Sequence, residues 1–240
     1  MAGKQSKRTR GFGTAFSEQG RTYEQTSRET KEAISESEVR EHWEARAKRK
    51  GLQAVMSARH WRITNWIESR KLKRNIFNFL KGRVEGKRVF ELGFGIGRMT
   101  TELAKRAREV IAADASEEMH RKASQNLKGA RNVTLHKGKI TEVATRGEFD
   151  LVFDSIVLLH ILNPAELRAT AERMKQLCAD NGHVFLCEHV YEPRKSEGSR
   201  YSIFRRPEEY EKLFEPFELV ARKPTRVSGD LFMMYLFKKK

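Results

Sequence analysis

The spacing of apolar positions changes from helical in the first third of the chain to strand-like beyond it. In the first third, Val39, Trp43 and Ala47 recur every four residues, which predicts a helix over 36–50. A second apolar stripe predicts another helix over about 58–81. Both helices would have one apolar face, so we expect their apolar residues, tryptophans included, to pack on a neighbouring domain.

The chain that precedes these helices is polar. Residues 1–35 contain scattered Gly, Ser, Thr and Gln, and too few apolar positions for a core element. We expect them to form a flexible basic tail, or a lid that brings Tyr23 over a binding site. The helices then make an N-terminal extension, residues 36–82, and residues 83–240 make a single domain.

From residue 88 onward, short apolar runs alternate with helical patterns. Five such runs predict β-strands, at residues 88–92, 109–114, 132–137, 148–160 and 183–190. Asn181 and Gly182 predict a turn into the fifth strand. Two further runs on either side of Gly229 predict an antiparallel pair. The pattern indicates an α/β fold, a doubly wound, seven-stranded and mostly parallel sheet that ends in this pair.

A glycine-rich turn follows the first of these strands. Gly93, Gly95 and Gly97 lie between the strand and a helix, and Glu91 lies two residues before the first glycine. In this arrangement the backbone comes close to a bound nucleotide. Arg98 occupies the position where a dinucleotide fingerprint needs glycine, and the Gly-Lys-Ser/Thr of a Walker loop is absent.

The second strand ends in an acidic residue. Asp114 lies at its tip, 17 residues beyond Gly97. A carboxylate in this place can accept hydrogen bonds from both ribose hydroxyls of an adenosine that lies over the glycine turn. Ser116 then predicts the N-cap of the next helix.

These two motifs together resemble those of the class I S-adenosylmethionine-dependent methyltransferases. The first family motif is similar to residues 89–100 and the second to residues 110–119. The resemblance implies a Rossmann-like fold, methyltransferase activity and S-adenosyl-L-methionine as the cofactor. The expected cofactor contacts are Glu91, Gly93, Gly95, Gly97, Asp114, Ala115, Lys139, Ile140 and Asp154.

Lys139 departs from the pattern of that family. The family often has an acid just after the glycine that ends the third strand, where it binds the adenine amino group. Lysine stands there in this chain. We therefore expect Ile140 or a backbone group to hold the base instead.

The end of the fourth strand should carry the reacting groups, because ligands of open α/β sheets bind beyond the carboxyl ends of the strands. Asp154, Ser155 and His160 lie there. The Asn/Asp-Pro-Pro-aromatic motif of enzymes that methylate base amines is absent, as is the cysteine of those that methylate pyrimidine carbon 5. The sequence after Ser155 resembles the branch that acts on small molecules, in which the histidine sometimes serves as a base.

His160 is the first candidate for a catalytic base, and the alternative is a packed, hydrogen-bonded histidine. Glu188 and His189, at the end of the fifth strand, are the other catalytic candidates. The polar segment over 192–206 is expected to vary with the substrate. The expected substrate contacts are Tyr23, Ser155, Tyr191, Tyr201 and Arg205.

The composition of the chain indicates where in the cell the protein is located. No apolar run approaches 18 residues, so we expect no membrane span and no membrane partner. The N-terminus lacks the apolar stretch of a secretory signal. The two cysteines, Cys178 and Cys187, lie on different predicted elements, which favours neither a disulfide nor a metal site. A cytoplasmic location is therefore expected.

Net charge keeps more than one function open. The chain has a formal net charge of +16, which is spread along its length. Methyl transfer to an oxygen or nitrogen centre of a small molecule is the main hypothesis, supported by the fourth-strand motif. The basic charge favours an alternative substrate, namely RNA, the ribosome or a protein. Lys139 keeps open a third possibility, a non-catalytic subunit that binds S-adenosylmethionine.

Overall fold

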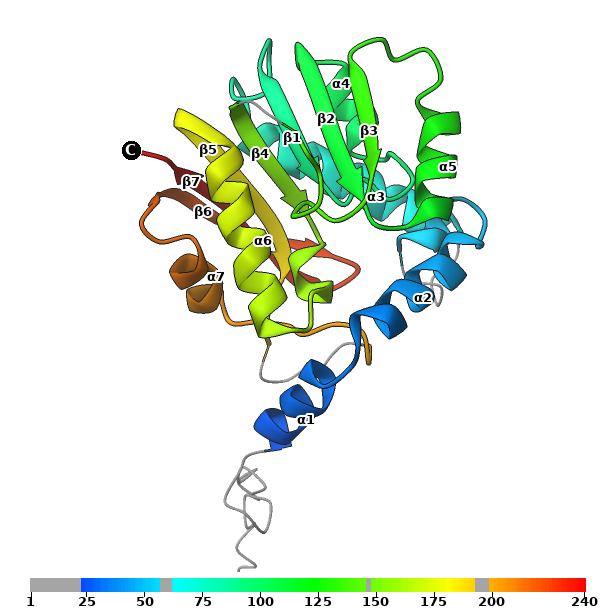
Figure 1. Ribbon diagram of the computed structural model, residues 1–240. Helices are drawn as coiled ribbons and strands as arrows, with labels where there is room; N and C mark the ends of the chain where they lie inside the picture. Colours follow the sequence, from blue (N-terminus) through cyan, green and yellow to red (C-terminus); the bar gives the residue numbers. More distant parts are fainter. Residues whose placement is uncertain (1–22, 57–61, 146–147, 193–198) are drawn as a thin grey trace, which may run out of the picture.

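The structure is a computed structural model that describes residues 23–56, 62–145, 148–192 and 199–240 (Figure 1). A seven-stranded sheet, in the order β3-β2-β1-β4-β5-β7-β6, forms its centre. The strands are β1 (Arg88–Leu92), β2 (Glu109–Asp114), β3 (Val133–Lys137), β4 (Phe149–Ser155), β5 (Cys178–His189), β6 (Glu218–Val227) and β7 (Asp230–Lys238). The first five strands pair in parallel with one another, and β7 is antiparallel to both β5 and β6. The predicted fold class is confirmed.

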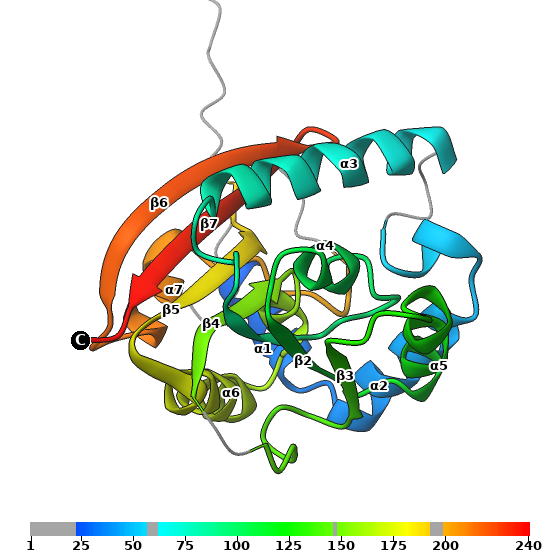
Figure 2. The ribbon, with the colours of Figure 1, turned by 90° about the horizontal axis from the view of Figure 1, so that it is seen from above.

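The first three helices precede the sheet in the chain, and the others alternate with its strands. They are α1 (Tyr23–Glu32), α2 (Glu36–Ala47), α3 (Arg62–Phe79), α4 (Thr100–Ala104), α5 (Glu117–Asn126), α6 (Pro164–Leu177) and α7 (Pro207–Leu213). Two short 3-10 helices are η1 (Gly51–Ala54) and η2 (Leu158–His160). Viewed from above, α3 and α4 lie on one side of the central strands and α6 on the other (Figure 2).

Two apolar clusters hold these layers together. Val89 of β1 belongs to the cluster that includes Leu72 and Ile76 of α3. The next residue, Phe90, points the other way and belongs to the cluster that includes Met174 of α6. Successive side chains of a strand alternate between faces, and both faces of a central parallel strand are covered. This explains why the runs that predict β1, β2 and β4 are mostly apolar on both faces.

The C-terminal strands form a tight hairpin at the edge of the sheet. Ser228 and Gly229 connect β6 to β7 with φ angles of 52° and 84°. Positive φ at both central residues is the geometry that suits the twist of a two-residue hairpin. Pro224 lies in β6, an edge strand, where a missing backbone N–H is tolerated.

The predicted turn at Asn181 and Gly182 lies inside a strand. β5 begins at Cys178, and its register with β4 shifts between Phe149 and Leu151. Asn181 has a φ of 61°, so the Asn-Gly pair forms an irregularity in the ladder where a turn was expected. The fifth strand is consequently longer than the predicted one.

The described part of the N-terminal segment contains a helix that the apolar pattern does not predict. The predicted tail over 1–35 includes the helix α1; residues 1–22 lie outside the described residues. Arg28 of α1 forms an ion pair with Glu209 of α7 at 2.7 Å. Lys31 donates a hydrogen bond to the Ser202 carbonyl. Because α1 attaches through these polar contacts, it needs no apolar stripe of the kind that would predict a packed helix.

The third helix is rotated relative to its predicted packing. Its buried face includes Asn65 and Ser69, whereas Trp66 and Ile67 are 53% and 51% exposed. The expectation that the tryptophans pack on the domain is wrong for Trp66. Trp43 is packed, since it lies against a buried apolar cluster below α2. Trp61 lies outside the described residues.

Candidate active site

A cavity of about 560 Å³ lies where β1, β2 and β4 end. Its floor includes Gly93 and Gly95 after β1, and Asp114, the last residue of β2. His160, in η2, lines another wall. The parallel strands bring these residues together because their carboxyl ends meet at the same edge of the sheet. The cavity is large enough for a nucleotide-sized ligand.

The glycine turn is fixed by steric limits. Gly93 has a φ of +66°, and a Cβ atom there would lie 2.3 Å from Cγ2 of Val157. Gly95 has a φ of +54° and would bring a Cβ to 3.0 Å from Val55. Both positions therefore need glycine, for conformation and for space. Gly97 also has a positive φ, but it packs against Leu127 and does not line the cavity.

Asp114 is held in place by the glycine turn itself. Its Oδ2 accepts a hydrogen bond from the Gly95 N–H at 2.8 Å, and its Oδ1 accepts one from the Ser116 N–H at 2.9 Å. Burial raises the pKa of its carboxyl, while these backbone donors lower it. Each carboxylate oxygen keeps a lone pair for a further donor. Ala115, beside it, also lines the cavity.

Glu91 lies at the base of the cavity. It is 2% exposed, and burial raises the pKa of its carboxyl to about 8. Its Oε2 has no hydrogen-bond partner among the described residues. An unpartnered buried oxygen that lines a cavity is suited to accept a hydrogen bond from a ligand.

Lys139 closes one side of the cavity by ion pairing. Its ammonium group contacts Glu36 of α2 and, at 2.9 Å, Glu166 of α6. It therefore links the N-terminal extension to the domain. Ile140 is buried and also lines the cavity.

The helix α2 forms a roof over the cavity. Val39, Arg40 and Trp43 line it from this helix. The other end of α2 is held by Glu44, whose carboxylate accepts from the Glu117 N–H at the start of α5. Lys122 of α5 donates to the backbone carbonyls of Ala47, the last residue of α2, and Arg49. Figure 1 shows α2 beside α5 on the outside of the domain.

His160 is a neutral histidine with a defined tautomer. Its Nδ1 lies 2.7 Å from the Tyr201 carbonyl oxygen, which can only accept. The proton is accordingly assigned to Nδ1, and Nε2 carries the free lone pair. Burial lowers the pKa of the ring to about 4. The Trp43 ring lies edge-on to it, 4.6 Å between centroids.

Glu188 does not line the cavity. Its carboxylate accepts from the backbone N–H groups of Val157, Leu158 and Leu159 at 3.0, 2.8 and 3.3 Å. A carboxylate with these bonds is placed to hold the segment that carries His160. The expected catalytic role of Glu188 therefore gains no support from its position.

Arg205 holds the same segment from the other side. Its guanidinium donates to the carbonyls of Leu158 and Ile161 at 2.9 and 2.7 Å. It is 2% exposed and does not line the cavity, although it was expected to contact the substrate. Arg205 thus positions His160 through the backbone.

The remaining predicted residues divide between the cavity and its surroundings. Ser155 lines the cavity, and its Oγ has no hydrogen-bond partner in the described ranges. Asp154 is buried below it, where burial and the Glu188 carboxylate raise its pKa. His189 packs between two phenylalanine rings, outside the cavity. Tyr23 begins α1, and its side chain lies outside the described residues.

Two tyrosines in the segment between β5 and α7 also do not line the cavity. Tyr191 packs below the guanidinium of Arg206. Tyr201 donates a hydrogen bond to Glu38 of α2 at 3.3 Å, and His42 stacks on its ring. Tyr201 therefore joins the roof helix to the segment that orients His160.

Sequence reasoning missed most of the roof. Arg40 and Trp43 line the cavity from α2, and Asn163 and Glu166 line it from the start of α6. The apolar spacing of α2 was visible, but periodicity does not tell which surface a helix will cover. In the part of the chain that the structure describes, no group of three or more His, Cys, Asp or Glu could hold a metal ion.

The strand order, the glycine turn and the carboxylate after β2 define a Rossmann-like domain of the class I methyltransferase type. Residues 89–182 match the family described as "Methyltransferase domain". Residues 89–182 are therefore similar to a methyltransferase domain, and the sheet around them has the fold of the class I methyltransferases.

Curated relatives extend this match. Phosphoethanolamine N-methyltransferase 1 of Arabidopsis thaliana is 35% identical over 140 residues, which cover 55% of this chain and 28% of that protein. The corresponding enzyme of Triticum aestivum is 34% identical over 139 residues, 55% of this chain and 27% of that protein. The chain thus spans little more than a quarter of the length of these relatives.

Solved structures share the fold. The N-methyltransferase NodS from Bradyrhizobium japonicum, in complex with S-adenosylhomocysteine, has a TM-score of 0.67 and 16% identity, over 84% of this chain and 98% of that one. The phosphoethanolamine N-methyltransferase 1 of Haemonchus contortus has a TM-score of 0.69 and 18% identity, over 85% of this chain and 50% of that one.

The cavity residues fit S-adenosylmethionine. Asp114 offers a fixed carboxylate for ribose hydroxyls. Oε2 of Glu91 has no hydrogen-bond partner among the described residues, and a donor on the ligand could supply one. Gly93 and Gly95 leave backbone at the cavity where a side chain would intrude. Lys139 is engaged in ion pairs, which makes an adenine contact from its ammonium group unfavourable.

Proposed function

We propose that this chain transfers the methyl group of S-adenosylmethionine to an oxygen or nitrogen centre of a small molecule. One observation carries the proposal: a neutral histidine, His160, lines the same cavity as the glycine turn and Asp114. The cofactor supplies a methyl group that is already activated by its sulfonium. The protein then needs to provide proximity, orientation and, for a protonated acceptor, a base.

The residues divide this work as follows. Asp114 and Glu91 bind the cofactor through its polar groups, and Gly93 allows the close approach. The roof helix keeps water from the cavity through Val39 and Trp43. Nε2 of His160 takes the proton that the acceptor loses, and the Tyr201 carbonyl keeps the ring oriented by accepting from Nδ1.

A nitrogen centre is the favoured acceptor. The plant relatives are named phosphoethanolamine N-methyltransferases, and they support an amine acceptor for this chain. Trp43, which lines the cavity, is a residue of the kind that recognises an amine or ammonium group. The location of the two cysteines, free and buried, supports a reducing compartment such as the cytoplasm.

The test is a methyl-transfer assay with tritiated S-adenosylmethionine on fractionated cell extract, and with phosphoethanolamine as a defined acceptor. Label in small molecules, lost in His160→Asn, is the expected result. The matched control is His136→Asn, in β3 and outside the cavity, which should transfer normally. Label only in RNA or protein would contradict the proposal.

A second candidate is a macromolecular acceptor, that is RNA, the ribosome or a protein. The formal net charge of +16 favours it, because a basic surface attracts polyanions. Binding of RNA would fall steeply with added salt. Absence of label from every fraction would instead favour a subunit that binds the cofactor without catalysis.

A further inference from the structure

The outer face of α3 carries apolar side chains that nothing in the described structure covers. Ile63, Trp66 and Ile67 are 70%, 53% and 51% exposed, the largest exposed fractions of any large apolar residues in the described part of the chain. Their spacing puts them on neighbouring turns of one helix. Figure 2 shows α3 on the outside of the molecule, beside the hairpin of β6 and β7.

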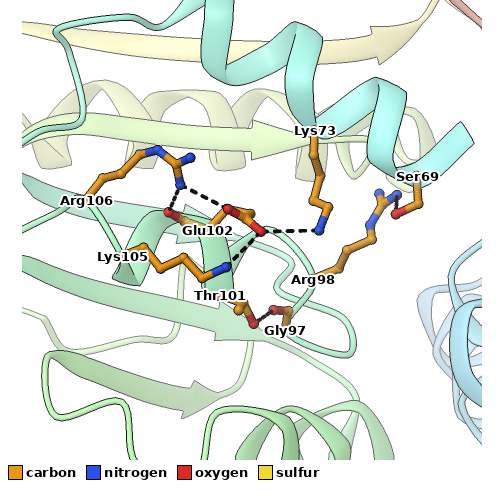
Figure 3. Close-up of polar contacts among 8 residues, drawn as sticks. All are labelled: Ser69, Lys73, Gly97, Arg98, Thr101, Glu102, Lys105 and Arg106. Carbon is orange, nitrogen blue, oxygen red and sulfur yellow. Dashed lines mark hydrogen bonds and ion pairs between the residues drawn. The ribbon is translucent and has the colours of Figure 1, made fainter. Parts of the chain in front are cut away.

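Contacts on the inner face of α3 fix the orientation of the helix about its own axis. Ser69 accepts a hydrogen bond from Arg98 at 3.3 Å, and Lys73 forms an ion pair with Glu102 at 3.3 Å (Figure 3). Asn75 donates to Thr225 of β6 at 2.8 Å. Leu72 and Ile76 are fully buried on the same side. The helix cannot turn Ile63 and Ile67 inward without breaking these contacts, so their exposure is a stable property of the fold.

Basic residues continue the same face along the helix. Arg70, Lys71 and Arg74 are all exposed, and the Arg70 guanidinium lies 4.7 Å from the Trp66 ring centroid. Glu68 is the single acid in the sequence of α3, and its carboxylate accepts from the Ser228 N–H in the β6–β7 turn. We call Ile63, Trp66, Ile67, Arg70, Lys71 and Arg74 the α3 outer face.

We propose that the α3 outer face docks on the surface of a bilayer that contains anionic phospholipids. Aliphatic side chains and a tryptophan would enter the interfacial region, and the arginines and lysine would meet the lipid phosphates. The charge complements such a surface, and the apolar residues lie at one end of the face, where they can insert together. The chain as a whole, at +16, is attracted to the same surface.

Two other occupants fit the face less well. RNA would use the arginines and stack on Trp66, but it gains little from two exposed isoleucines. A second copy of this chain would bring the same basic residues together, and the two copies would repel each other.

The inference departs from our expectation of no membrane partner. That expectation came from the lack of a long apolar run, and interfacial binding needs only one apolar face. No described helix is long and apolar enough to cross a membrane.

Vesicle cosedimentation tests the proposal. The full chain should sediment with phosphatidylcholine vesicles that contain phosphatidylserine and not with vesicles of phosphatidylcholine alone. The variant Ile63→Ser/Trp66→Ser/Ile67→Ser should lose about tenfold or more in affinity. The variant Arg70→Glu/Lys71→Glu/Arg74→Glu should lose as much at low salt.

Two matched variants serve as controls. Leu219→Ser/Val220→Ser removes exposed apolar residues of β6, and Lys128→Glu/Arg131→Glu reverses exposed charge after α5. Both should bind vesicles like the wild type. Stabilisation of each variant by S-adenosylhomocysteine shows that it is folded.

Three results would overturn the proposal. The first is a wild-type chain that does not bind the anionic vesicles. The second is binding that the α3 variants and the controls weaken equally. The third is a dimer in solution that only the α3 variants dissociate, which would assign the face to a second copy. The methyl-transfer assay is independent of all three, so the proposed function can stand or fall separately.

Discussion

At the scale of single residues, the site depends on positions where only one side chain fits. Gly93 combines a positive φ with a close approach to Val157, and His160 combines a fixed Nδ1 proton with a lowered pKa. The sequence pointed to both, because a glycine turn after a strand and a histidine after the fourth strand are local patterns. Their partners, Val157 and the Tyr201 carbonyl, are distant in the chain and were not predictable.

Gly93→Ala should lower the free energy of unfolding by about 2–5 kcal/mol, because the left-handed φ and the overlap with Val157 both cost energy. Gly129→Ala is the matched control, since Gly129 has a φ of +98° and open space around its Cα. The control should lose only about 1–2 kcal/mol. Urea unfolding measures both, and equal losses would contradict the steric part of the argument.

His160→Asn should reduce turnover by about 10²–10⁴-fold and leave the affinity for S-adenosylhomocysteine nearly unchanged. The pKa of about 4 implies that the wild-type ring stays neutral above pH 5 or so. Protonation of His160 should therefore cause no loss of activity between pH 8 and pH 6. Steady-state kinetics across pH are the measurement. A wild-type limb near pH 6.5 that disappears in His160→Asn would show that the ring titrates normally.

At the scale of elements, the roof helix α2 and the segment over 157–161 complete what the sheet begins. Glu188 and Arg205 fix that segment through its backbone. Both residues were predicted to act in the site, Glu188 as an acid or base and Arg205 as a substrate contact. Both residues lie next to the site, as predicted, but they bind the backbone of a loop and do not line the cavity. A strand pattern does not reveal which side chains at the end of the strand point toward a ligand.

Lys139→Ala should loosen α2, because the lysine links Glu36 of this helix to Glu166 of α6. These groups are partly exposed, so the loss of global stability should be small, at most about 1 kcal/mol. Amide hydrogen exchange in α2 should rise instead. Lys137→Ala removes an exposed pair with Glu117 and should leave α2 unchanged. Unaltered exchange in Lys139→Ala would mean that the other end of α2 suffices to hold it.

At the scale of the whole molecule, the fold was more predictable than the site. Seven strands, their order of appearance and the antiparallel pair at the C-terminus follow from local apolar runs and turn residues. Helix docking was less predictable, since α1 attaches by polar contacts and α3 buries Asn65 and Ser69 in place of Trp66. Such packing depends on residues elsewhere, here Arg98 and the β6 strand, and it decides which faces of the molecule remain open.

Calorimetric titration with S-adenosylhomocysteine tests the central claim, that the cavity is a site for S-adenosylmethionine, most directly. The wild type should bind, and Asp114→Ala should bind about 1–3 kcal/mol more weakly, because the ribose hydroxyls lose a charged acceptor. NAD should give no measurable heat, since Arg98 stands where a dinucleotide site needs glycine. Unchanged affinity in Asp114→Ala, or binding of NAD without binding of S-adenosylhomocysteine, would contradict the account.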